Sequence, residues 1–331
     1  MSKKIKKENR YFIFDNPLEL NFKYFIKRIV LFFVDIFYNL ILSANNKKVK
    51  KPKKYYTSIC GIFKNEALYM KEWIEYHKMI GIEHFYLYNN FSDDNYEEIL
   101  SPYIKAGVVT LKDWPVKAGQ ISAYKDCYEN YKLESHWICF LDFDEFICPY
   151  EEKQISNWLK NFEKYPSIVI YWKMFGTSGK IKREKKLVTE EFYVSWKKLV
   201  DIGKVFINTK FEFEKIYHHH IQSKTNIFSK EFFIPSVNEY GKFICFGLNR
   251  GSFLKKTTIQ INHYWSKTYE EYIRKKIPRG DVFFLDREYD LEAFYYHENK
   301  NISSDYKIFR FLIQLKENMR LFKVGDLEDE N

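Results

Sequence analysis

The chain has 331 residues and a formal net charge of +10, from 54 lysines and arginines against 44 aspartates and glutamates. Much of the excess lies in the first 54 residues, where the stretch 47–54 is almost entirely lysine. The charge of the remaining residues is closer to balance, which argues against a nucleic-acid partner. The basic N-terminal arm instead favours an anionic membrane surface as its partner. A chain of this length can form one large domain or two smaller ones.

The cysteines are odd in number and scattered, and several fall within apolar segments. No spacing among them suits a zinc site, and no pattern indicates a disulfide framework. We therefore expect small buried side chains in a reducing, cytoplasmic environment. The positions are Cys60, Cys127, Cys139, Cys148 and Cys245.

The first region, residues 1–54, contains an apolar stretch over 29–42. In a helix, Asp35 and Asn39 lie four residues apart and therefore on one face. The stretch is short for a membrane span and carries a charge near its centre. We interpret it as an interfacial helix that binds the cytoplasmic face of a membrane together with its basic flanks. A helix docked on the protein itself and a signal anchor are the alternatives.

From residue 55 onward, β-rich and helical segments alternate, which predicts an α/β fold with a mostly parallel sheet flanked by helices. The expected strands cover residues 55–63, 83–88, 108–111 and 137–141. The expected helices between them cover residues 64–80, 96–103 and 120–133. We expect this α/β domain to span residues 55–268, followed by a helical C-terminal extension over 269–331.

Three carboxylates, those of Asp142, Asp144 and Glu145, follow the fourth apolar strand. Unpaired carboxylates are costly to bury, so we expect them at the exit of the strand, where open α/β sheets bind ligands. In an extended segment, Asp142 and Asp144 point to the same face because strand side chains alternate. Two convergent carboxylates suit a divalent cation that also holds a diphosphate.

Polar residues also close the first two strands. Glu66 lies where the first strand gives way to a helix, and a turn over 89–94 closes the second strand. Helix capping and turn formation explain both clusters in isolation. Both nevertheless lie at the carboxyl ends of strands that we expect to be neighbours, which is where a nucleotide binds in such sheets.

The order of these motifs resembles the nucleotide-sugar glycosyltransferases of family 2 type, and more closely those of family 92. The resemblance runs over residues 56–280 and includes the later segments 172–179 and 263–267. It implies a GT-A (Rossmann-like) fold, a nucleoside-diphosphate sugar as donor, most simply a UDP-sugar, and Mn²⁺ or Mg²⁺ as cofactor. It also implies transfer with inversion to a glycan or lipid-linked glycan acceptor in surface polysaccharide or lipopolysaccharide biosynthesis.

The resemblance also assigns roles to individual residues. The residues implied to bind the donor are Glu66, Asn89, Asn90, Asp94, Gln120 and Asp142. The implied metal ligands are Asp142, Asp144 and His263. The residues implied to act in catalysis are Asp144, Glu145, His263 and Lys267, of which the last would offset diphosphate charge. Tyr124, on the same helix as Gln120, is expected near the donor for the same reason.

The acceptor hydroxyl needs a general base, and the sequence leaves its identity open. Glu145 is near in sequence, although strand alternation would point it away from the two aspartates; Glu190 and Glu191 are alternatives. We expect Lys204 to be a solvated surface residue, and one of the histidines 218–220 to be functional or packed.

Two other functions remain open at this point. A metal-dependent phosphohydrolase or nuclease would use Asp142, Asp144 and Glu145, but it would need further acidic ligands. A non-catalytic binding protein would use the basic charge, which is concentrated in the N-terminal arm.

Overall fold

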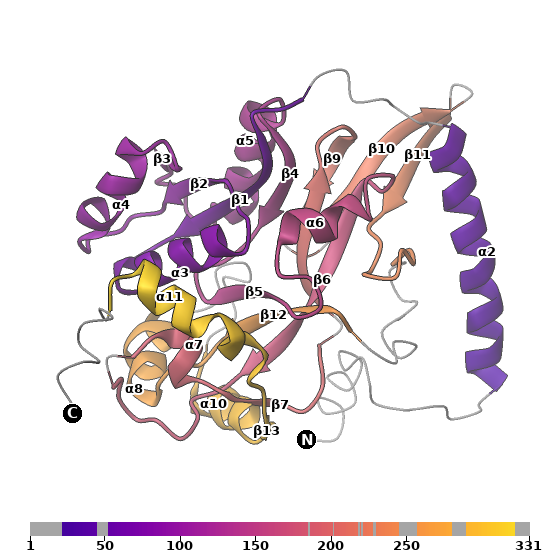
Figure 1. Ribbon diagram of the computed structural model, residues 1–331. Helices are drawn as coiled ribbons and strands as arrows, with labels where there is room; N and C mark the ends of the chain where they lie inside the picture. Colours follow the sequence, from indigo (N-terminus) through magenta and orange to yellow (C-terminus); the bar gives the residue numbers. More distant parts are fainter. Residues whose placement is uncertain are drawn as a thin grey trace, which may run out of the picture.

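The computed structural model of the protein is built around a ten-stranded sheet with helices on both of its faces (Figure 1). The described residues are 22–44, 52–184, 186–200, 202–217, 219, 221–227, 230–244, 257–279 and 289–321.

Four neighbouring strands form the parallel half of the sheet, in the order β3-β2-β1-β4. These strands are β1 (Tyr55–Phe63), β2 (His84–Asn89), β3 (Val109–Asp113) and β4 (Ser135–Phe140). The connecting helices are α3 (Ala67–Met79), α4 (Tyr96–Lys105) and α5 (Gln120–Tyr131). β2 and β4 are buried along their whole length, which explains their near-continuous apolar sequences. The predicted alternation of strands and helices is confirmed.

The second half of the sheet contains antiparallel pairs. β8 (Gly203–Asn208) is antiparallel to both β4 and β6 (Ser167–Phe175), so β6 runs in the same direction as β1 to β4. β12 (Ile259–Tyr264) is parallel to β6 and therefore shares this direction. The remaining strands of the sheet are β5 (Glu145–Pro149), β7 (Val194–Trp196) and β13 (Asn301–Ser304). The predicted α/β class is confirmed, and the carboxyl ends of β1, β4 and β12 point the same way.

Helix α3 fixes the segment that follows β4. The indole of Trp73, which is fully buried, donates to the backbone carbonyls of Asp142 at 3.1 Å and Glu145 at 2.9 Å. The hydroxyl of Tyr76 donates to the carbonyl of Ile147 at 2.8 Å. These bonds hold the turn between β4 and β5, and hence its two aspartates, from the buried side. The sequence did not predict β5, which pairs with β12 from a distant part of the chain.

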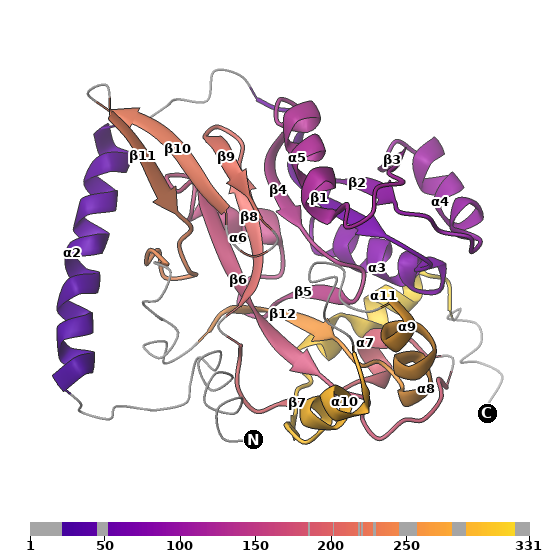
Figure 2. The ribbon, with the colours of Figure 1, turned by 180° about the vertical axis from the view of Figure 1, so that it is seen from behind.

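Helix α2 (Phe22–Ala44) lies beside a small antiparallel sheet of β9 (Glu212–Ile216), β10 (Ile221–Ile227) and β11 (Lys230–Pro235), as Figures 1 and 2 show. The carboxylate of Asp35 accepts from the backbone N–H of Phe243 at 3.2 Å, and the ring of Phe37 lies 6.2 Å from that of Phe232. The helix expected over 29–42 is confirmed, and one of its faces docks on the protein. Across the described parts of the chain, we find no helix with the length and apolar character needed to span a bilayer.

The C-terminal part consists of short helices around β12 and α3. Its elements are α8 (Tyr269–Glu271), a π-helical turn (Tyr272–Lys276), α9 (Ile277–Arg279), α10 (Leu291–Glu298), a 3₁₀-helix (Lys307–Phe311) and α11 (Leu312–Asn318). Between α10 and the 3₁₀-helix, β13 pairs with β7, so this part also contributes a strand to the main sheet. The other short helices of the protein are α6 (Ile155–Lys160) and α7 (Val188–Glu191).

Candidate active site

The candidate site lies where β1, β4 and β12 end. The backbone N–H of Leu141 bonds to the carbonyl of Cys60 in β1 at 3.0 Å, and that of Tyr264 in β12 bonds to the carbonyl of Asp144 at 2.8 Å. The turn after β4 is therefore tied to a strand on either side. This edge of a parallel sheet is the usual place for a ligand.

The carboxylate of Asp142 is held by three side chains. Gln120 donates to Oδ1 at 2.9 Å and Tyr124 donates to the same oxygen at 3.2 Å. The ammonium of Lys204 lies 2.7 Å from Oδ2. Gln120 and Tyr124, which are expected near the donor, thus contact Asp142, and their role in donor binding stays a prediction. The side chain of Asp142 is still 31% exposed, so part of the carboxylate faces outward.

Lys204 is not the solvated surface residue expected from the sequence. Its side chain is 1% exposed and lies between the carboxylates of Asp142 and Glu145. Burial alone would lower the pKa of Lys204, but the two carboxylates outweigh it and raise the pKa above its ordinary value. The expectation was wrong because Lys204 belongs to β8, which the sheet buries between β4 and β6.

Glu145 turns toward Asp142, contrary to the expectation from strand alternation. Its Oε2 accepts from the backbone N–H of Asp142 at 3.0 Å and lies 3.7 Å from the ammonium of Lys204. The side chain is fully buried, and burial raises the pKa of this carboxyl. These contacts favour a role in supporting the turn; the assignment of Glu145 as a catalytic base stays a prediction.

Asp144 has different partners from Asp142. Its Oδ2 lies 3.5 Å from Nε2 of His263 and 3.8 Å from the ammonium of Lys276. Burial favours a higher pKa for Asp144, but His263 and the nearby lysines outweigh it and hold the pKa well below its usual range. Because residues 143 and 144 form a turn, the alternation assumed for an extended segment does not apply.

Glu66 faces two further cations. The ammonium of Lys267 donates to its Oε2 at 3.3 Å, and the guanidinium of Arg279 lies 3.7 Å from Oε1. Lys267 has a positive φ of 50°, and its ammonium sits 3.4 Å from the centre of the Tyr69 ring. The structure thus brings the predicted residues Glu66 and Lys267 into direct contact.

The turn after β2 is closed by its own polar side chains. Asn89 accepts from the backbone N–H of Ser92 and donates to Asp113, while Asn90 donates to two backbone carbonyls after β3. Asp94 accepts from the N–H of Ala67 at 2.8 Å, which caps the start of α3. These bonds join the ends of β1 and β2. The nucleoside-binding role of Asn89, Asn90 and Asp94 stays a prediction.

The other candidate bases have partners of their own. Glu190 forms an ion pair with Lys316 at 2.6 Å, and Glu191 forms one with Arg183 at 3.3 Å. Of the three consecutive histidines only His219 falls among the described residues. Its ring packs 4.7 Å from that of Trp172, which in turn lies 4.6 Å from the ring of His263.

A divalent cation fits part of the predicted ligand set. Asp144 and His263 offer one carboxylate and one imidazole nitrogen, which leaves most positions to phosphate oxygens and water. Asp142 fits less well, because protein donors already occupy both of its oxygens. Within the described residues there is no group of three or more His, Cys, Asp or Glu side chains arranged to hold a metal ion alone.

Lys276 and Arg279 were not predicted as site residues. The sequence signal was a run of basic residues at 274–279, which is usually a solvated helix face. Burial lowers the pKa of Lys276 to about 7, despite the opposing effect of Asp144. The position of this ammonium depends on the π-helical turn, which a sequence pattern does not reveal.

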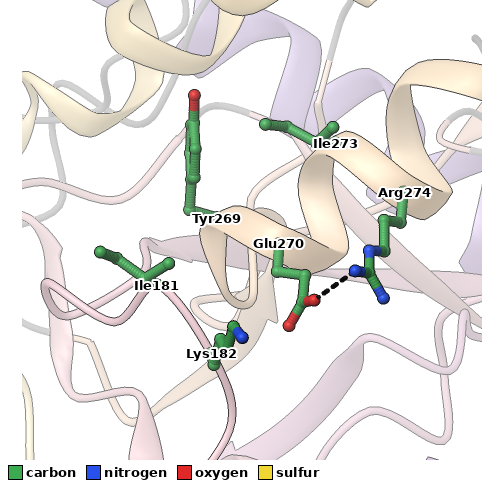
Figure 3. A pocket seen from close by; sticks show the side chains of 6 residues that line it. All are labelled: Ile181, Lys182, Tyr269, Glu270, Ile273 and Arg274. Carbon is green, nitrogen blue, oxygen red and sulfur yellow. Dashed lines mark ion pairs between the residues drawn. The ribbon is translucent and has the colours of Figure 1, made fainter.

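A separate pocket of about 230 Å³ opens beside α8 (Figure 3). Its lining combines apolar side chains with the ion pair between Arg274 and Glu270, whose atoms lie 2.9 Å apart. The lining residues are Ile181, Lys182, Tyr269, Glu270, Ile273 and Arg274. None of the predicted site residues lines this pocket, so it is distinct from the candidate site.

The fold is that of an α/β protein whose candidate site lies at the carboxyl edge of its sheet, the usual place for a ligand in such folds. Residues 53–275 match the model of Glycosyltransferase family 92. The match covers more than half of the chain, and the chain belongs to this family. The resemblance noted from the sequence is thereby confirmed, and the sheet described above confirms the α/β class of fold that it implied.

Named relatives match only part of the chain. A glycosyltransferase family 92 protein of Oryza sativa subsp. japonica is 31% identical over 141 residues, which are 41% of this chain and 24% of the relative. The galactan beta-1,4-galactosyltransferase GALS3 of Arabidopsis thaliana is 30% identical over 138 residues, which are 37% of this chain and 27% of the relative. The matches thus span about a quarter of these relatives.

Among solved structures, residues 1–349 of S. aureus TarS align with a TM-score of 0.33 and 14% identity. The alignment covers 46% of this chain and 47% of the TarS chain.

The buried ion pair predicts a large effect of Lys204→Met on stability. The substitution leaves Asp142 and Glu145 without their buried cation, so we expect the free energy of unfolding to fall by about 3 kcal/mol. Urea unfolding followed by tryptophan fluorescence measures the change. Lys224→Met is the control, because Lys224 makes only partly exposed ion pairs with Glu214 and Glu231 and should leave the midpoint unchanged. Equal midpoints for both variants would contradict this account of Lys204.

Proposed function

We propose that the protein transfers a glycosyl group, with inversion, from a nucleoside-diphosphate sugar of the UDP-sugar class to a glycan or lipid-linked glycan. The proposed setting is the biosynthesis of a surface polysaccharide or lipopolysaccharide. One observation carries the proposal: in a member of family 92, the carboxylate of Asp144 lies between His263 and Lys276 at the edge where the parallel strands end. The name of the Arabidopsis relative, a galactosyltransferase, is in line with this chemistry.

Asp142 would position the donor through a carboxylate that is already held in place before the donor binds. Gln120 and Tyr124 fix one carboxylate oxygen and Lys204 fixes the other, so the group is rigid before the donor arrives. Among the described residues, Oδ2 has a single protein donor, Lys204, and can accept a further hydrogen bond from a ribose hydroxyl, as acidic residues do at this edge of nucleotide-binding sheets. Preorganisation of this kind lowers the entropy cost of binding.

Asp144 and His263 would hold Mn²⁺ or Mg²⁺ together with the donor diphosphate. When bound, such a cation stabilises the negative charge of the leaving diphosphate. Lys267 would contribute a further positive charge near Glu66. A phosphohydrolase is less well supported, because the described residues offer no third acidic ligand that would complete a metal site made by the protein alone.

Asp144→Asn tests the proposed donor chemistry. The change removes the negative charge that would bind the cation, so nucleotide release from UDP-sugars in the presence of Mn²⁺ should fall at least about hundredfold. Treatment with EDTA should abolish the wild-type activity, and added Mn²⁺ should restore it. Glu129→Gln, at a side chain that is 62% exposed on α5, is the charge-matched control and should keep the wild-type rate.

Two results would contradict the proposal. One is a wild-type enzyme that releases no nucleotide from any sugar nucleotide, with or without metal. The other is an Asp144→Asn enzyme that retains the full rate.

We further propose that α2 attaches the protein to an anionic membrane surface. Ile29, Phe32, Phe33, Ile36 and Leu40 are all exposed, with 66% of Leu40 accessible. At 3.6 residues per turn they share one side of the helix, opposite the buried Leu31 and Leu42. The charge of Asp35, which would oppose insertion, is turned inward toward Phe243. An apolar helix face flanked by lysines is typical of interfacial binding.

The membrane proposal predicts that Phe33→Glu/Leu40→Glu loses its affinity for vesicles. Two charged groups replace two large apolar side chains, so co-sedimentation with phosphatidylcholine–phosphatidylserine vesicles should fall at least about tenfold. Nucleotide release in solution should stay at the wild-type level. Leu133→Glu is the control, because Leu133 is 81% exposed just after α5 and not on α2, so its substitution should leave vesicle binding unchanged. Unchanged sedimentation of the double variant would exclude α2 as the attachment surface.

A further inference from the structure

Three cations follow β12 and face the carboxylates of the candidate site. They are Lys267, Lys276 and Arg279, which we call the basic clamp. Lys267 and Arg279 approach Glu66, and Lys276 approaches Asp144. Three basic side chains thus surround two carboxylates, an arrangement that is suited to a further anion.

The ion pairs of the basic clamp are long. Only the ammonium of Lys267 is within hydrogen-bond distance of its carboxylate, at 3.3 Å. The guanidinium of Arg279 lies 3.7 Å from Glu66, and the ammonium of Lys276 lies 3.8 Å from Asp144. At these distances the carboxylates attract the cations without using up their N–H donors.

Lys276 is the most unusual member of the clamp. It is 8% exposed, its ammonium donates to the backbone carbonyl of Trp265, and it lies 4.3 Å from the centre of the Trp265 ring. An ammonium carries three N–H donors, and burial of a charge with incomplete pairing is unfavourable for folding. A buried cation that is aimed at Asp144 and incompletely bonded fits an anion that binds beside that aspartate.

The backbone around the clamp departs from regular geometry. Lys267 has a φ of 50°, which is unusual for a residue other than glycine, and residues Tyr272–Lys276 form a π-helical turn. A π-helical turn accommodates one extra residue and so rotates the following side chains by about 100° relative to an unbroken α-helix. Such irregularities are concentrated at functional sites. Here they determine where Lys276 and Arg279 point.

We propose that Lys276 and Arg279 bind the diphosphate of the donor and that Lys276 is a catalytic residue of the transfer. This inference rests on the proposed function. The bond between the anomeric carbon and the β-phosphate oxygen breaks, and its electron pair stays on that oxygen. The acceptor oxygen bonds to the anomeric carbon, and its proton leaves to a base or to water. The ammonium of Lys276 hydrogen-bonds the phosphate and stabilises the charge that develops there.

The assignment of this role to Lys276 follows from its surroundings. Lys267 is already engaged by Glu66 and by the ring of Tyr69, and the side chain of Arg279 is 37% exposed. Of the three clamp residues, Lys276 alone combines burial with direct proximity to Asp144, the expected ligand of the cation that would hold the diphosphate. A charge acts more strongly in a site that excludes water than on the surface.

The test compares nucleoside diphosphates with monophosphates. We would measure the affinities of UDP, GDP and CDP, and of UMP, GMP and CMP, for the full chain by calorimetry with Mn²⁺ present. In Lys276→Met, binding of the diphosphate recognised by the wild type should weaken at least about tenfold, while binding of the corresponding monophosphate stays unchanged. Arg274→Met is the control on the same π-helical turn, because its side chain is 75% exposed and paired with Glu270. It should bind both nucleotides as the wild type does.

A kinetic measurement separates catalysis from binding. For nucleotide release from the matching sugar nucleotide, kcat of Lys276→Met should fall at least about tenfold, and Lys276→Arg should recover part of the loss because it restores the positive charge.

Three results would overturn the inference. If Lys276→Met binds the diphosphate as tightly as the wild type, Lys276 does not contact it. If the variant loses the diphosphate and the monophosphate equally, its role is structural. If the wild type binds no nucleoside diphosphate, both this inference and the proposed function fail.

Discussion

Compensation of buried acidic groups by buried cations is the constraint on which the rest of this structure depends. The chain places Asp142, Asp144 and Glu145 directly after a strand that is buried throughout. Carboxylates in such a place would destabilise the fold unless cations came close. The ammonium of Lys204 lies close to Asp142 and Glu145, and that of Lys276 lies near Asp144, which also faces the imidazole of His263. The elements that carry these basic side chains therefore stabilise the fold around the carboxylates and also form the candidate site.

Two distant parts of the chain meet around this turn. Helix α3 holds it from the interior through Trp73, and β12 holds it from the side through a backbone bond to Asp144. The residues after β12 then return over the same edge and bring Lys276 and Arg279 toward Asp144 and Glu66. The segment after residue 268, expected to be a helical extension, thus supplies side chains to the site and a strand to the sheet.

The general architecture could be predicted because it depends on local patterns. Apolar runs such as 55–63 gave the strands, and helical spacing gave the helices between them. The aspartates after β4 could be assigned to the edge of the sheet by the same reasoning. Their detailed geometry could not, because a turn at residues 143 and 144 replaces the extended conformation from which a shared face was inferred.

Contacts between distant residues explain what the sequence did not reveal. Lys204 was expected in solvent, since only the pairing of β8 between β4 and β6 shows that it is buried. Lys276 depends on a π-helical turn, and Asp35 depends on the docking of α2 against Phe243. In each case a charged residue, usually solvated, is buried by tertiary structure.

A crystal structure of the complex with UDP and Mn²⁺ tests the central claim most directly. The account predicts that the diphosphate lies between Asp144 and the basic clamp, with its phosphate oxygens near Lys276 and the cation near Asp144 and His263. Nucleotide bound elsewhere, for example in the pocket beside α8, with Lys276 still directed only at Asp144 and Trp265, would contradict it.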